Sequence, residues 1–177
     1  MTPGRAALIE LIAQYLKGLL DPTVSSLEVH KLMYFMQAAG EPLELQFKAG
    51  HYGPYAENLR HVMNAIEGHF VTGYADGGDA PGKVISLMPG AQAQATRFLE
   101  SFAATRQRFS QVADLVQGFE SPFGLELLAT VHWCGKHNPG DTVEQLTEQV
   151  YAWHELKPRF SPSRSGLPPP RWPIKAG

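Results

Sequence analysis

The sequence predicts a single, mainly helical domain (α+β class) with a small β-hairpin or short sheet. Apolar residues recur at helical spacing over several long segments, whereas strict alternation is confined to short stretches such as residues 43–47. The 177 residues, 44% of them hydrophobic, are enough for one core and too few to expect two. We expect the domain to span residues 1–157 and a proline-rich basic tail to span residues 158–177.

Two helices are predicted before residue 40. Residues 4–20 form a broad apolar stripe that ends near Gly18 to Pro22. Ser25, followed three residues later by Glu28, has the form of a capping box that opens the next helix. That helix is apolar around most of its circumference, so we expect it at the centre of the core. Its narrow polar strip comprises His30, Lys31, Tyr34 and Gln37.

A short strand and a central helix are predicted next. Residues 43–47 alternate in the manner of a half-buried strand, and Pro54 stands where a helix would begin. Gly68 is placed to end this helix. One face would pack on the core through Tyr55, Leu59, Val62, Met63 and Ile66. The other face would meet a partner through Glu57, Arg60, His61 and Asn64.

The second half of the chain is predicted to add a hairpin and further helices. Residues 70–74 and 84–87 can pair across a glycine-rich turn as a hairpin or wing. Residues 91–118 keep helical phase as one long helix or as two joined near Thr105. Ser121-Pro122 opens a helix that crosses the core, and Asp141, with Glu144 three residues on, opens a last one. The six prolines after residue 157 exclude regular structure in the tail.

Charge and composition restrict the function. Before residue 158 the chain holds seventeen acidic and eleven basic residues, whereas duplex DNA binding normally relies on a basic face. The single cysteine, Cys134, excludes an internal disulfide and fits a reducing compartment. We find neither a signal peptide nor an apolar run long enough to cross a bilayer, so we expect a cytoplasmic protein without membrane contact.

Three blocks of the chain are similar to a known family. The run HKLMYFMQ at 30–37, GEPL at 40–43 and GHYGPY at 50–55 resemble the SocA-like, or Panacea, antitoxin domains. Over longer blocks, at residues 27–45, 50–79 and 123–133, the chain looks like the C-terminal domain of the macrodomain antitoxin family DarG. The resemblance covers about residues 3–160.

The resemblance implies a SocA-like antitoxin fold and a non-enzymatic function. In that family the domain neutralises DarT, a toxin that ADP-ribosylates thymidine in single-stranded DNA, and is proposed to mimic the DNA substrate. We therefore expect a DarT-like toxin as the partner, no direct contact with nucleic acid, no cofactor and no metal. The resemblance does not extend to the family's N-terminal macrodomain, which removes ADP-ribose from DNA, so we expect no hydrolase activity.

The expected partner-binding surface combines carboxylates, in place of phosphates, with rings, in place of bases. Asp79 could add a further carboxylate. The surface comprises His51, Tyr52, Tyr55, Glu57, Asn58, Arg60, His61, Asn64, Glu67, His69, Tyr74 and Asp76.

Other interpretations of the same residues stay open. The Tyr52–Tyr55 segment is also explained as a structural turn, and Glu57, Arg60 and His61 as a solvated helix face. The 70–87 hairpin could be the wing of a winged-helix regulator, which would need a basic recognition helix. A hydrolase could be built on histidines, with zinc at His51, His61 and His69 or with a nucleophile at Cys134 beside His132 and His137.

Overall fold

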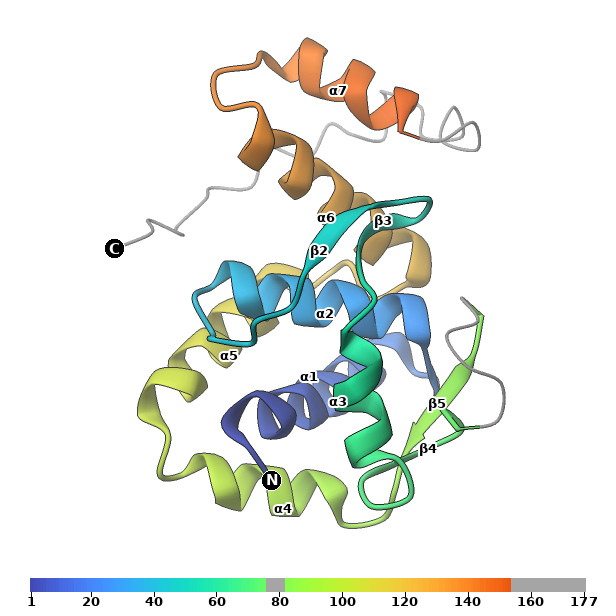
Figure 1. The fold of residues 1–177 in the computed structure, drawn as a ribbon, viewed down its shortest axis with the longest axis vertical. Coiled ribbons are helices and arrows are strands. Elements are labelled where there is room, and N and C mark those ends of the chain that lie inside the picture. Colours follow the sequence, from blue (N-terminus) through green and yellow to red (C-terminus); the bar gives the residue numbers. More distant parts are fainter. Residues whose placement is uncertain (76–81, 154–177) are drawn as a thin grey trace.

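The helices lie in layers, one above another, from α4 at one end of the molecule to α7 at the other (Figure 1). The computed structural model describes residues 1–75 and 82–153. The helices of this part are α1 (Pro3–Leu19), α2 (Ser26–Ala38), α3 (Leu59–Ile66), α4 (Ala91–Leu99), α5 (Ala103–Val116), α6 (Pro122–His137) and α7 (Val143–Ala152). The strands are β1 (Val24–Ser25), β2 (Phe47–Gly50), β3 (Gly53–Ala56), β4 (Val71–Thr72) and β5 (Val84–Leu87). This confirms the predicted mainly helical class with a small β part.

Helix α2 is the centre of the core, as predicted. Its N-terminus has the predicted capping box, in which Ser25 and Glu28 bind each other's backbone. It packs against α1, α5, α6 and β3. Of its polar strip, His30, Lys31 and Tyr34 are buried and Gln37 is half-buried. Their burial is tolerated because these groups have partners: the Tyr34 hydroxyl lies 2.7 Å from His132 Nδ1, and Lys31 Nζ donates to the carbonyl of Pro54 at 2.8 Å.

Two apolar clusters share α1. The main cluster joins α1 to α2, α3, α5 and α6, and a smaller one joins α1 to α4. Because α1 has apolar side chains on two faces, it lies between layers, as Figure 1 shows. The smaller cluster comprises Ala6, Ile9, Ala91, Ala95 and Leu99.

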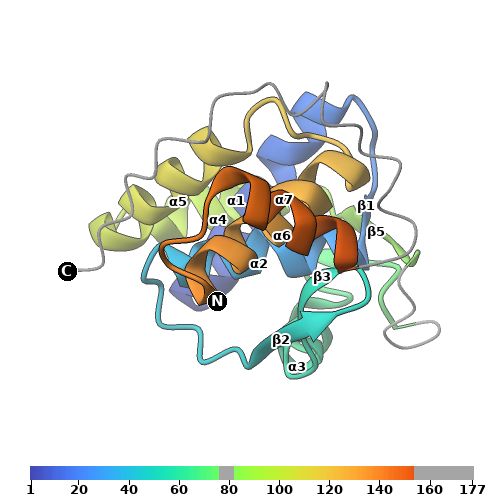
Figure 2. The same cartoon turned by 90° about the horizontal axis from the view of Figure 1, so that it is seen from above.

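The strands form two small antiparallel sheets. Strands β1, β5 and β4 lie in that order, with Val24 opposite Ile85 and Val71 opposite Leu87, which confirms the predicted pairing of 70–74 with 84–87. Strands β2 and β3 form a separate hairpin with a two-residue turn, His51-Tyr52. In Figure 1 this hairpin lies between α7 above it and α3 below it, and in Figure 2, seen from above, it lies over α3.

The predicted strand at 43–47 is wrong in its position, since β2 begins only at Phe47. The side chain of Gln37 explains the shift. Its amide nitrogen donates to the carbonyl of Leu45, and its amide oxygen accepts from the N–H of the same residue, both at 2.8 Å. A side chain thus satisfies backbone groups that would otherwise pair with a neighbouring strand.

The predicted start of the central helix at Pro54 is also wrong. Pro54 lies in β3, opposite Ala49, and α3 begins at Leu59. The lost N–H of a proline is tolerated in a two-stranded hairpin as it is in the first turn of a helix, so the residue alone does not distinguish the two. The core-facing residues from Leu59 to Ile66 are correct, whereas Tyr55 belongs to the strand.

The C-terminal half follows the prediction with small shifts. Residues 91–118 form two helices, which meet at residues 100–102 rather than near Thr105. Ser121 caps α6 as predicted. The last helix is capped by Thr142 and Gln145, not by Asp141 and Glu144, and the side chain of Asp141 accepts a hydrogen bond from Gln149 instead. The tail predicted at 158–177 lies outside the described residues.

None of the helices in the part of the chain that the structure describes is long and apolar enough to cross a membrane.

Candidate functional site

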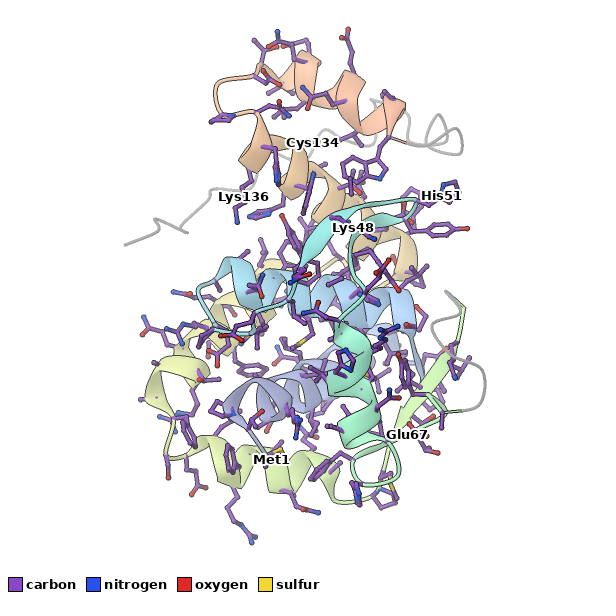
Figure 3. The ribbon with its side chains drawn as sticks, in the orientation of Figure 1. Met1, Lys48, His51, Glu67, Cys134 and Lys136 are labelled. Atoms are coloured by element: carbon purple, nitrogen blue, oxygen red, sulfur yellow. The ribbon has the colours of Figure 1, made fainter. Side chains whose placement is uncertain are left out.

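A groove lies between the β2–β3 hairpin and the start of α3. Its volume is about 330 Å³. We call it the hairpin groove. Figure 3 shows Lys48 on β2 and His51 at the turn of the same hairpin. The groove is lined by Gln46, Phe47, Lys48, Glu57, Asn58, Arg60 and His61.

The hairpin is fixed to the body from one side by α2. The ring of Tyr55 stacks on His30, with centroids 4.2 Å apart, and the N–H of Ala56 donates to His30 Nδ1 at 3.3 Å. Lys31 holds the carbonyl of Pro54. The polar strip of α2 therefore determines where β3 lies.

The turn of the hairpin is fixed from the other side by α7. The indole Nε1 of Trp153 donates to the carbonyl of Gly50 at 2.7 Å, across 103 positions of sequence. The indole is in turn in edge contact with Trp133 of α6, at 6.3 Å between centroids. Two distant helices thus hold the two ends of one short hairpin.

The floor of the groove is held by a side-chain amide. Asn58 donates to the carbonyl of Glu44 and accepts from the N–H of Gln46, both at 3.0 Å. Phe47 is half-buried and lies edge-on to Tyr34 at 5.3 Å. These contacts bind the segment before β2 to the segment before α3, so the walls of the groove are preformed.

Cationic and polar groups face the open side of the groove. Lys48 Nζ lies 2.6 Å from Glu57 Oε1, and both side chains are more than half exposed, so this ion pair contributes little to stability. Arg60 and His61 are exposed on the first turn of α3. With histidine counted as neutral, the lining residues have a net charge of +1, on a body whose acidic residues outnumber its basic ones. Such a groove suits an anionic or hydrogen-bonding ligand.

The structure separates the predicted site residues into three groups. Four line the groove: Glu57, Asn58, Arg60 and His61. His51 and Tyr52 lie at the hairpin turn, ring edge to ring face at 4.8 Å, and Asn64 and His69 are exposed elsewhere on or after α3. Three others do not join a surface site, and the fourth, Asp76, lies outside the described residues; the three are Tyr55, Glu67 and Tyr74.

Each residue of the last group has a structural explanation where the structure describes it. Tyr55 is half-buried against His30. Glu67 accepts from the N–H groups of Gly73 and Tyr74, both at 3.1 Å, and so organises the turn before β4. Tyr74 itself is 3% exposed. Asp76 and Asp79 lie outside the described residues.

Sequence reasoning missed three groove residues, Gln46, Phe47 and Lys48. They were missed because β2 was placed too early and the hairpin was not expected. The segment Gly50-His51-Tyr52-Gly53 was the available signal, since two residues between glycines are typical of a tight hairpin. No comparable local signal pointed to Trp153 as a hairpin contact, because it acts across most of the chain.

The histidines do not form a metal centre among the described residues, where no three His, Cys, Asp or Glu side chains are arranged to hold an ion. His132 is in the core, 2.7 Å from the Tyr34 hydroxyl, and burial, with Lys136 and His137 nearby, lowers the pKa of His132 to about 4. His137 instead stacks on Trp133 at 4.1 Å. Cys134, which lies between His132 and His137 in the sequence, is buried on α6 (Figure 3).

Comparison with known proteins places the chain beside a class of hydrolases. No family model matches the chain. Over 161 residues, 90% of this chain, it is 42% identical to a DNA ADP-ribosyl glycohydrolase of Thermus aquaticus. It is 35% identical over 181 residues to proteins of the same name from Mycobacterium tuberculosis and Mycobacterium bovis. It covers 43% of the first protein and 51% of the others, so the chain spans about half the length of the curated relatives it matches.

These relatives contradict the function that the resemblance implied. Their name denotes an enzyme that acts on ADP-ribosylated DNA, not a SocA-like or DarG-type toxin-binding antitoxin domain. The predictions of a DarT-like toxin as partner, of DNA mimicry and of a non-enzymatic protein are therefore wrong, and so is the winged-helix alternative. The expected absence of a nucleic-acid contact is contradicted as well, because the relatives' name implies a DNA substrate. The blocks that suggested the antitoxin lie within the region aligned with these relatives, so the same residues are shared with proteins of a different name.

Proposed function

We propose that this chain functions in the removal of ADP-ribose from DNA, as part of a DNA ADP-ribosyl glycohydrolase. The observation that supports this most is the identity of 42% over 90% of the chain to a protein of that name. Similarity of this extent covers the core, the hairpin and α3 alike. We place this activity in the cytoplasm.

The geometry agrees with a part in substrate binding. A preformed groove with lysine, arginine and histidine side chains at its mouth offers donors to phosphate oxygens. Further groups that we propose to face the DNA lie at the hairpin turn and on or after α3. Three of them are exposed, namely His51, Asn64 and His69, and Tyr52 is half-buried.

A chimera tests the proposal. The aligned region of the Thermus aquaticus relative is replaced by residues 1–177 of this chain, and release of ADP-ribose from an ADP-ribosylated single-stranded oligonucleotide is measured. We expect a chimera with kcat/KM close to that of the relative. As a control, the same exchange is made with a chain carrying Leu32→Asp, which places a charge in the core and should abolish both folding and activity.

A chimera that unfolds cooperatively on heating, like the relative, but releases no ADP-ribose would overturn the proposal. So would a Leu32→Asp chimera that is unfolded in this region and yet keeps full kcat/KM, because the region would then have no part in the reaction.

A further inference from the structure

We propose that the hairpin groove binds the sugar–phosphate backbone of single-stranded DNA through Lys48, Arg60 and His61, while His51 and Tyr52 stack on a neighbouring base. The inference rests on the proposed function and deepens it, because it assigns the nucleic-acid contact to one surface.

The groove has a local excess of positive charge. Lys48 and Arg60 contribute two cationic groups to one small groove, against the single carboxylate of Glu57. Arg60 forms no ion pair with any residue in the described ranges. Its guanidinium therefore stays available for the bidentate contact with a phosphate that this group favours.

Two aromatic rings lie at the turn of the hairpin, close to the groove. His51 and Tyr52 form the turn of the hairpin, and the turn projects away from the body (Figure 3). Lys48 lies three residues before His51, or roughly 10 Å along an extended strand. A strand of DNA a few nucleotides long can thus reach the cationic groove and the rings together. Cationic grooves with neighbouring aromatic rings are typical of proteins that bind single strands.

The charge of the chain and the size of the groove favour a single strand of DNA over a duplex. A duplex needs a broad basic face, whereas acidic residues outnumber basic ones, seventeen to eleven, before residue 158. The volume of about 330 Å³ is near the lower limit of small-ligand pockets, which suits one sugar–phosphate unit. A flexible single strand enters such a groove with one phosphate backbone, whereas a duplex would bring two against a predominantly acidic chain.

The hairpin beside the groove is held in place by contacts with the rest of the protein. The hairpin is bound at Pro54 by Lys31, at Gly50 by Trp153 and across Tyr55 by His30. The groove therefore loses little conformational entropy when it binds a ligand.

Binding of unmodified DNA tests the inference. The fluorescence anisotropy of labelled oligothymidylate of about 10 nucleotides is measured against the full chain over a series of salt concentrations. We expect the double variant Lys48→Glu/Arg60→Glu to bind at least roughly tenfold more weakly. The slope of log K against log salt should also become shallower, by about 1.4, because two phosphate contacts are lost.

Two matched variants make the test specific. Arg97→Glu/Arg106→Glu changes the net charge equally at exposed positions on α4 and α5, and should leave both affinity and slope nearly unchanged. Glu57→Gln removes the carboxylate that pairs with Lys48 and should tighten binding. Thermal unfolding of each variant confirms that the fold is kept.

Equal weakening by the two double variants would overturn the inference, as would weaker binding of Glu57→Gln, tighter binding to a duplex of the same length, or no binding by the unaltered chain. Because this assay uses unmodified DNA and no turnover, its result is independent of the chimera. An active chimera with a groove that binds no DNA would overturn this inference alone, and an inactive chimera with a groove that binds would overturn the proposed function alone.

Discussion

His132 lies in the core of the molecule beside the hydroxyl of Tyr34, whose own pKa is raised, chiefly by burial. Burial lowers the pKa of His132 to about 4, whereas an unfolded histidine titrates near 6.5. The unfolded chain therefore binds this proton first as the pH falls. The stability due to a neutral His132 is complete above about pH 6.5 and is lost progressively down to about pH 4.

We therefore expect the free energy of unfolding to fall by on the order of 3 kcal/mol between pH 7 and pH 4 through this residue. Urea unfolding at a series of pH values measures it. The variant His132→Gln keeps a group that can bond to Tyr34 and does not titrate, so its loss over the same range should be smaller by that amount. Parallel curves for the two proteins would show that His132 is not the responsible group.

Glu41 provides a second test at the residue scale. Its buried carboxylate accepts from Arg108 at 2.8 Å and from Thr105 at 3.0 Å. Removal of one partner of a buried ion pair leaves a charge without compensation. Arg108→Ala should cost about 3 kcal/mol in denaturant unfolding, whereas Arg106→Ala, exposed on the same helix, should cost less than about 0.5 kcal/mol. Similar costs at both positions would contradict this explanation.

At this scale the sequence predicted only part of the site. Arg60 and His61 were assigned correctly to an exposed face because their spacing within α3 does not depend on where the helix begins. Tyr55 and Tyr74 were misassigned because an amphipathic ring fits a surface and a core equally well. Lys31 was correctly placed in a polar strip. Its hydrogen bond to the hairpin could not be predicted, because that contact exists only in the folded structure.

At the scale of elements, the hairpin and α7 are linked through one hydrogen bond. Trp153→Phe keeps an aromatic ring but removes the N–H that Gly50 accepts from. We expect a loss of about 1 kcal/mol in stability and faster amide hydrogen exchange at the hairpin turn than elsewhere. Val143→Ala, at an exposed position of α7, is the control and should change neither. Uniformly faster exchange along the chain would mean that Trp153 stabilises the fold generally and not the turn.

Elements that are defined by their own residues were predicted well. The caps at Ser25 and Ser121 lie where the sequence placed them, because a capping hydrogen bond spans only three residues. Strand β2 was misplaced because Gln37 and Asn58 satisfy backbone groups of residues 44–46. The start of α3 was misplaced because a proline fits a hairpin strand as well as the first turn of a helix. Such long-range side-chain contacts leave no periodic trace in the sequence.

At the scale of the whole molecule, α1 joins both apolar clusters, so they should unfold together. Ile9→Ala, in the smaller cluster, should cost about 3 kcal/mol and lower the melting temperature. The far-UV circular dichroism of all helices and the tryptophan fluorescence, to which Trp133 and Trp153 contribute at the other end, should then change at the same temperature. Separate transitions would show that α4 unfolds independently of the rest.

The fold class followed from periodicity and length, since a chain with this many amphipathic segments has few other ways to bury them. The function did not follow. The hairpin that brings residues 46–48 beside residues 57–61 was not recognised in the local pattern, so the groove was not predicted. The family resemblance suggested an activity that the relatives' names contradict.

Gly53 has a consequence for anyone who alters this molecule. Its backbone has φ +90°, and a methyl group there would stand 3.0 Å from Thr130 Oγ1 and 3.2 Å from Lys31 Cε. An alanine at this position, directly after the turn, would push β3 away from Lys31 and Thr130 and so shift the hairpin that carries Phe47 and Lys48. A single added carbon atom thus changes the shape of the hairpin groove without replacing any side chain that lines it. Position 53 is therefore a suitable place to alter the groove by design.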